Sequence, residues 1–67
     1  MIELILIENN KFTAKVVDRF QDIACVMFRL RRWCLVNWGT LWELRHDNSF
    51  FGYHAINTSN GDVLEIW

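Results

Sequence analysis

The stretch from Asp18 to Trp38 constrains the fold most, because it is the one segment long and patterned enough to form a full-length helix. Its apolar residues recur at steps of three and four, which places them on one helical face: Phe20, Ile23, Met27, Leu30 and Cys34. Asp18 is positioned to cap the start, and Gly39 follows closely enough to terminate the helix. The sequence therefore predicts one amphipathic helix over about residues 18–37.

A β-strand remains an open alternative for residues 23–36. Residues of two sets also alternate there as they would on the two faces of a strand. One set is Val26, Phe28 and Leu30, and the other is Met27, Arg29 and Arg31. A strand would require a turn nearby, and neither Gly nor Pro occurs from Met1 to Trp38. We therefore favour the helix.

Residues 1–17 are typical of a β-hairpin with its turn at Asn9-Asn10. This turn would pair Ile7 with Phe12, Ile5 with Ala14, and Glu3 with Val16. One face would carry Ile5, Ile7, Phe12, Ala14 and Val16, and the other would carry Ile2, Leu4, Leu6 and Val17. Neither face of the first strand is polar.

Residues 40–67 indicate three further strands. The first turn is expected at Asp47-Asn48-Ser49, and a hairpin with the Asn-Gly signal is expected at residues 58–61. One face would carry Phe51, Tyr53, Ala55, Leu64 and Ile66, and the other Phe50, Gly52, His54, Ile56, Val63, Glu65 and Trp67. The chain is thus predicted to be a single α+β domain over residues 1–67, ββαβββ, with a mostly antiparallel sheet and the helix on one face.

The apolar content exceeds what one small core can enclose. Hydrophobic residues make up 52% of 67 residues, and one helix covers only one face of a sheet that is apolar on both. One of two sets of side chains would then be left in water. The first set is Ile2, Leu4 and Leu6, and the second is Phe50, Ile56 and Trp67. The alternative is a sheet curled enough to enclose both faces. Exposed apolar surface of this kind favours a protein interface.

We therefore predict a non-enzymatic protein-protein interaction module that binds another protein and forms a homodimer through a sheet face. Trp33 and Trp67 are the expected anchors, while Arg29 and Arg32 set the orientation. Trp38 and Trp42 are expected in the core. No named family emerges. The short length and lack of motifs are typical of small accessory proteins of phages and mobile elements, which often inhibit or modulate a host protein by binding it.

Nucleic-acid binding is the alternative function. It would use the arginine-rich part of the helix together with one aromatic residue: Arg29, Arg31, Arg32 and Trp33. A net charge of −1 argues against a dedicated nucleic-acid binder. Three arginines toward a helix C-terminus also commonly form a solvated end that compensates the helix dipole.

Catalytic and metal sites are not expected. The possible zinc ligands Cys25, Cys34, His46 and His54 are spaced by nine, twelve and eight residues, whereas zinc ligands usually come in close pairs. Two sets of residues are considered for catalysis, and neither matches a nucleophile motif: His46-Asp47 with Ser49, and Cys25 with a histidine. We expect no enzyme, no cofactor and no metal.

No leader peptide is expected, because no basic segment is followed by an apolar one with a small-residue cleavage site, and no apolar run is long enough to span a bilayer. Two cysteines nine residues apart on one helix could not form a disulfide bond. A cytoplasmic protein without membrane contact is the resulting expectation.

Overall fold

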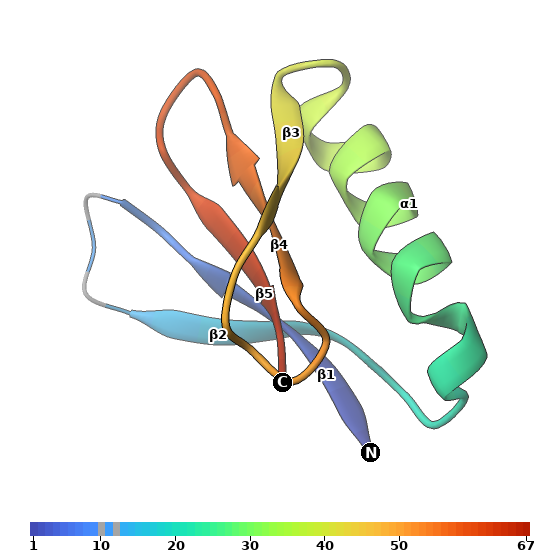
Figure 1. Cartoon of the computed structure of the whole chain (residues 1–67). Helices are drawn as coiled ribbons and strands as arrows, with labels where there is room; N and C mark the ends of the chain where they lie inside the picture. Colours follow the sequence, from blue (N-terminus) through green and yellow to red (C-terminus); the bar gives the residue numbers. More distant parts are fainter. Residues whose placement is uncertain (10, 12) are drawn as a thin grey trace.

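The computed structural model describes residues 1–9, 11 and 13–67, and Figure 1 shows their arrangement. Within them the chain forms one antiparallel sheet and one α-helix, with strands β1 (Ile2–Ile7), β2 (Ala14–Phe20), β3 (Trp42–His46), β4 (Tyr53–Asn57) and β5 (Val63–Ile66) and helix α1 (Val26–Trp38). The strand order is β2-β1-β5-β4-β3. A short 3-10 turn, η1 (Ile23–Cys25), precedes α1. The predicted α+β domain with ββαβββ order is confirmed.

The helix begins later than predicted. Asp18 and Phe20 belong to β2, where they pair with Leu4 and Ile2 of β1. The capping role assigned to Asp18 is therefore wrong. Asp22 instead caps η1, because its carboxylate accepts a hydrogen bond of 2.9 Å from the Ala24 N–H, and Cys25 stands at the N-cap position of α1 without a side-chain capping bond. The strand continues to Phe20 because its pairing with β1 satisfies the backbone groups that a helix would otherwise have used.

The end of the helix agrees with the prediction. Gly39 has a φ of 63°, a conformation that disfavours residues with a Cβ. Its N–H donates to the carbonyl of Leu35 at 3.1 Å. Residues 23–36 form η1 and most of α1, so the strand alternative for this segment is wrong.

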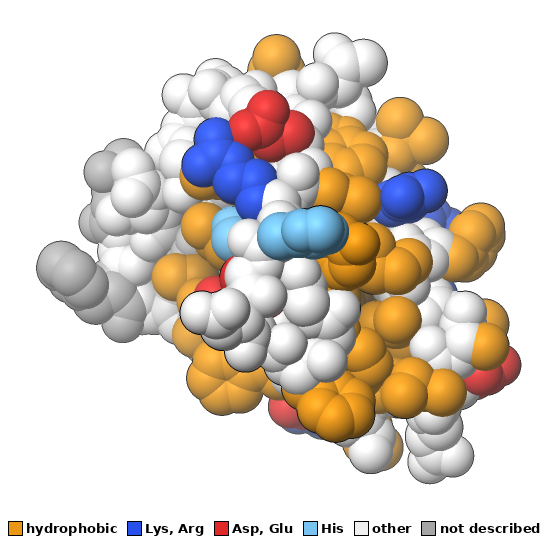
Figure 2. All heavy atoms as spheres, in the orientation of Figure 1, with side chains coloured by type: hydrophobic (Ala, Val, Ile, Leu, Met, Phe, Trp, Pro, Cys, Tyr) orange, Lys and Arg blue, Asp and Glu red, His pale blue; other side chains and the backbone are white. Residues whose placement is uncertain are grey.

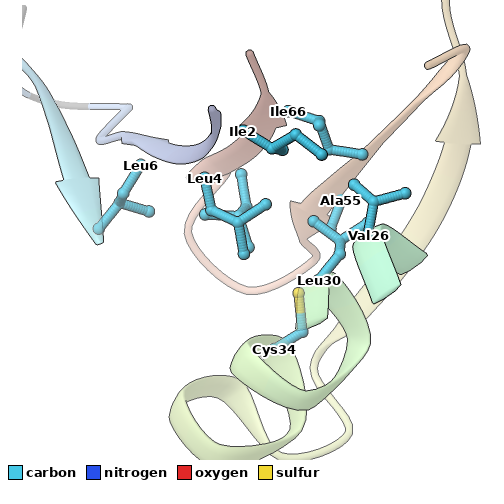
Figure 3. Close-up of a cluster of buried hydrophobic side chains, with 9 residues drawn as sticks. Ile2, Leu4, Leu6, Val26, Leu30, Cys34, Ala55 and Ile66 are labelled. Carbon is cyan, nitrogen blue, oxygen red and sulfur yellow. The ribbon is translucent and has the colours of Figure 1, made fainter. Parts of the chain in front are cut away.

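The core lies between α1 and the central strands (Figure 3). The buried stripe of α1 is spaced by four residues, at Val26, Leu30 and Cys34, whereas Ile23 is exposed. The stripe packs on the face of the sheet that carries Ile2, Leu4, Leu6, Ala55, Leu64 and Ile66. Trp38 and Trp42 are partly buried against this cluster, as predicted.

The β1–β2 hairpin has a different register from the predicted one. Ile5 pairs with Val16, and Glu3 pairs with Arg19. A register shift between Leu4 and Ile5 leaves Val17 as an extra residue in β2, which is a β-bulge. The predicted turn at Asn9-Asn10 and the pairing of Ile7 with Phe12 fall partly on Asn10 and Phe12, which lie outside the described residues.

The β4–β5 hairpin follows the predicted facing. Ala55 pairs with Leu64 on the helix side, and His54 pairs with Glu65 on the other side. Gly61 has a φ of 81°, and a Cβ at this position would lie 2.9 Å from Nδ2 of Asn9. The loop after β1 therefore packs closely on the β4–β5 turn.

No helix in the described part of the chain is long and apolar enough to cross a membrane. The longest, α1, has 13 residues.

Candidate protein-binding surface

The side of α1 that faces away from the sheet is apolar. Phe28, Leu35 and Val36 are 66%, 62% and 75% exposed. Phe28 and Leu35 are seven residues apart, so they lie two turns apart on one stripe of the helix. Large apolar residues grouped in water in this way mark an interaction surface.

An apolar hollow of about 500 Å³ adjoins this stripe. It is lined by Met27, Phe28, Arg31, Arg32 and Leu35 of α1 and by Trp42 of β3. The hollow exists because α1 packs mainly on β4 and β5, which leaves space beside β3 at the end of the sheet. In Figure 2, hydrophobic side chains form a broad area over this region, and basic side chains lie among them.

The rim of the hollow is positively charged. Among the described residues, Arg31 and Arg32 form no ion pair, and α1 contains no acidic residue. Neither arginine lies in the last turn of α1, so they do not compensate the negative C-terminal end of the helix dipole. Their charge is available to a ligand. The hollow therefore combines apolar walls with an unneutralised cationic edge.

Arg29 has a different role from its neighbours. Its guanidinium donates to both carboxylate oxygens of Asp18, at 2.9 and 2.7 Å, and lies 4.9 Å from the ring centroid of Phe20. The hydrogen bond from Arg29 holds the pKa of the Asp18 carboxyl below its usual range. Arg29 thus connects α1 to β2 and is already occupied within the protein.

The predicted anchors are divided between two faces of the molecule. Trp33 is partly buried and packs edge-on against Trp38, with 5.1 Å between ring centroids. It lines a second hollow, of about 330 Å³, together with Asp18, Arg29, Arg32, Val36 and Asn37. Trp67 is 63% exposed, but it follows Ile66 of the core and so faces the side of the sheet opposite α1. Its indole N–H donates to Glu65 at 3.0 Å.

Two residues of the candidate surface, Phe28 and Leu35, were not singled out from the sequence. The available signal was their spacing of seven residues, on the side of the helix opposite Leu30. That signal becomes readable only when the buried stripe is known to run through Val26, Leu30 and Cys34.

The face of the sheet opposite α1 carries a second apolar area. One cross-strand row runs through Ala14, Ile7, Val63 and Ile56. Of the two sets expected in water, Ile2, Leu4 and Leu6 are buried beneath α1, Phe50 and Trp67 are exposed, and Ile56 is partly exposed. The expectation was therefore wrong for the first set, because β1 turns these three side chains toward α1.

The residues considered for catalysis meet around Asp47. Asp47 accepts hydrogen bonds from the Ser49 hydroxyl and backbone N–H, and it lies 2.6 Å from Nδ1 of His54. The carboxylate, not the imidazole, is the central group, so Ser49 contacts no histidine that could act as its base. His46 instead packs edge-on against Tyr53. The cluster orders the loop between β3 and β4.

The Asp47 cluster predicts a measurable acid sensitivity. Hydrogen bonds from Ser49, with a contribution from His54, lower the pKa of Asp47 to about 2. Because the pKa is lowered in the folded state, the stabilisation is present above the ordinary carboxyl pKa and is lost as pH falls toward 2. We expect the Asp47 carboxyl to titrate near 2 by NMR, and the Ser49→Ala variant to shift this midpoint upward. An unchanged midpoint in that variant would contradict the assignment.

The cysteines do not resemble reactive or metal-binding thiols. Both are free, and the described residues contain no group of three or more Cys, His, Asp or Glu side chains that could hold a metal ion. Burial raises the pKa of the Cys34 thiol to about 12. The hydrogen bond to Asp22 raises the pKa of Cys25. Both thiols therefore stay protonated near neutral pH.

Comparisons with protein-family models, curated proteins and solved structures found no match to this chain. The geometry defines its class as a small α+β domain with one helix on one face of an antiparallel sheet.

Proposed function

We propose that this chain is a non-enzymatic protein-protein interaction module that binds its partner through the outer face of α1. The observation that carries the proposal is the pair Phe28 and Leu35, exposed beside an apolar hollow with Arg31 and Arg32 at its rim. Aromatic and arginine side chains are enriched among residues that dominate interface energetics. The proposal keeps Arg32 as an orienting residue and adds Arg31 in place of Arg29. It gives Phe28 and Leu35 the anchoring role that was expected of Trp33 and Trp67.

Such a protein acts by covering part of its partner. Occlusion of a partner's surface is the physical basis of the proposed role as a small inhibitor or modulator of a host protein, of the phage or mobile-element accessory type. Two free thiols are compatible with the cytoplasmic location expected from the sequence.

Substitution of the two apolar side chains tests the proposal. The test is affinity capture from the cells that carry the gene. We expect the double variant Phe28→Ser with Leu35→Ser to capture no more than about one tenth of the amount of partner that the unaltered chain captures. Leu41→Ser is the matched control, because Leu41 is also exposed (53%) but does not line the hollow. Far-UV circular dichroism verifies that all forms are folded. Equal capture by the double variant and the control would contradict the proposal.

Nucleic-acid binding through Arg29, Arg31, Arg32 and Trp33 has weaker support. Arg29 is paired with Asp18, and the carboxylate of Asp18 lies in the same hollow as Trp33 and Arg32. A carboxylate there repels phosphate. Titration with a single-stranded oligonucleotide at two salt concentrations distinguishes the functions, since phosphate contacts give steep salt dependence.

Self-association through the sheet is the second part of the proposal. The row from Ala14 to Ile56 crosses four strands and is apolar throughout, so a second copy could cover it with the same row. Val63 lies within this row. Sedimentation equilibrium should show a dimer that Val63→Lys dissociates, and a monomer at all concentrations would contradict this part.

A further inference from the structure

We propose that the free edge of β3 and the hollow beside α1 together bind an extended segment of the partner, which joins the sheet as a sixth strand. This inference rests on the proposed protein-binding function and names the segment that it recognises. The segment has large apolar side chains at alternate positions and an acidic residue among them. Addition of a strand to a sheet edge is an established mode of peptide recognition.

The two edges of the sheet differ in regularity. β2 contains the bulge at Val17, which interrupts the ladder of backbone groups along that edge. β3 pairs with β4 in continuous register from Trp42 to His46. In the described part of the chain no strand pairs with the other side of β3. Its outward N–H and C=O groups are therefore in position to pair with an added strand.

The hollow lies where side chains of an added strand would point. Neighbouring strands are about 4.8 Å apart, and alternate side chains face the same side of a sheet. Trp42 and Leu44 face α1 from β3, and Trp42 forms one wall of the hollow. Every second side chain of a strand placed beside β3 would therefore face α1, toward Leu35 and Phe28. The indole N–H of Trp42 donates to the Gly39 carbonyl at 2.8 Å, which fixes this wall.

The charges select an acidic segment. Arg31 and Arg32 line the hollow and have no ion-pair partner among the described residues. Glu43 and Arg45, on the opposite side of β3, pair with each other at 2.6 Å and so contribute little net charge to the edge. A carboxylate on the hollow side of the added strand would pair with the free arginines.

A library of random ten-residue peptides tests the proposal without knowledge of the partner. We expect the selected peptides to alternate apolar residues and to contain Asp or Glu at a position in phase with them. Methylation of alternate backbone nitrogens should abolish binding, and the bound peptide should protect from hydrogen exchange those amides of residues 42–46 that point away from β4. Arg31→Glu should lower the affinity for the selected peptides by about tenfold. Arg19→Glu on β2, at the opposite edge of the sheet, is the matched control and should have little effect on peptide binding.

Three outcomes would overturn the proposal. The first is selection of peptides with helical spacing of three and four residues, which would indicate a helix lying along α1. The second is binding that does not depend on backbone methylation, and the third is the absence of any selected peptide. If one of these occurs while Phe28→Ser with Leu35→Ser still abolishes partner capture, the protein-binding function stands and only the added strand is rejected.

Discussion

Leu30→Ala is expected to destabilise the protein by about 2–5 kcal/mol, the range for truncation of a fully buried leucine. Leu30 is fully buried at the centre of the helix stripe, between Val26 and Cys34, and packs in the cluster shared by α1 and the sheet. A domain of this size has a total stability of only about 3–10 kcal/mol. The variant should therefore be substantially unfolded at low denaturant concentration.

The same truncation at Leu35 provides the control. Leu35 is on the same helix and has the same side chain, but it is 62% exposed, so Leu35→Ala should change stability by no more than about 0.5 kcal/mol. Urea unfolding followed by far-UV circular dichroism measures both. Similar losses from the two variants would show that α1 does not pack as described.

Arg29→Ala should lower the free energy of unfolding measurably, but by less than Leu30→Ala. The substitution removes two hydrogen bonds to Asp18 and the contact over Phe20, and both charged side chains are partly exposed, which reduces the effect below that of a buried pair. The effect should also depend on pH. Since the pKa of Asp18 is lowered in the folded state, its contribution is present above the ordinary value of 3.8 and is lost as pH falls below it.

Denaturant unfolding at pH 7 and at acid pH measures this dependence. The difference in free energy of unfolding between Arg29→Ala and the unaltered chain should become smaller as Asp18 becomes protonated. Arg31→Ala is the matched control, because Arg31 has no ion-pair partner among the described residues and does not contribute to the lowered pKa of Asp18, and it should cause little loss of stability at either pH. A pH-independent difference for Arg29→Ala would contradict the ion-pair assignment.

The sequence was most informative where local signals agreed. The hairpin around Gly61 was predictable because the Asn-Gly pair and the alternation on both sides specify the same register, and Ala55 and Leu64 pair as expected. The end of the helix at Gly39 was predictable for the same reason, because one residue supplies a backbone conformation that others disfavour. The α+β order of elements followed from these boundaries.

The start of the helix was not predictable, because its apolar spacing extends backward into a strand. Phe20 fits the helical stripe by spacing, yet it pairs with Ile2 in the sheet. The bulge at Val17 determines which face of the sheet the last residues of β2 occupy. It places both Asp18 and Phe20 on the helix side, where they meet Arg29. No local feature of the sequence marks this extra residue, since it depends on the register in which β2 pairs with β1.

The candidate surface was only partly predictable for a related reason. Arg32 was named from the sequence and lines the hollow, whereas Phe28 was not named. The aromatic residues named as anchors, Trp33 and Trp67, do not line the hollow. Which side of a helix is buried depends on the sheet on which it packs. Once Val26 rather than Ile23 is in the core, Phe28 and Leu35 face the solvent.

The pairing of β1 with β5 has a consequence for how the chain folds. These strands lie side by side at the centre of the sheet, although they are the first and last in the chain. The β1–β2 hairpin and the β3–β4–β5 meander can each form from nearby residues, and within the sheet they pair through this ladder. During synthesis β1 can pair with β5 only after β5 has left the ribosome. Until then Leu4 and Leu6 lack the neighbours that enclose them.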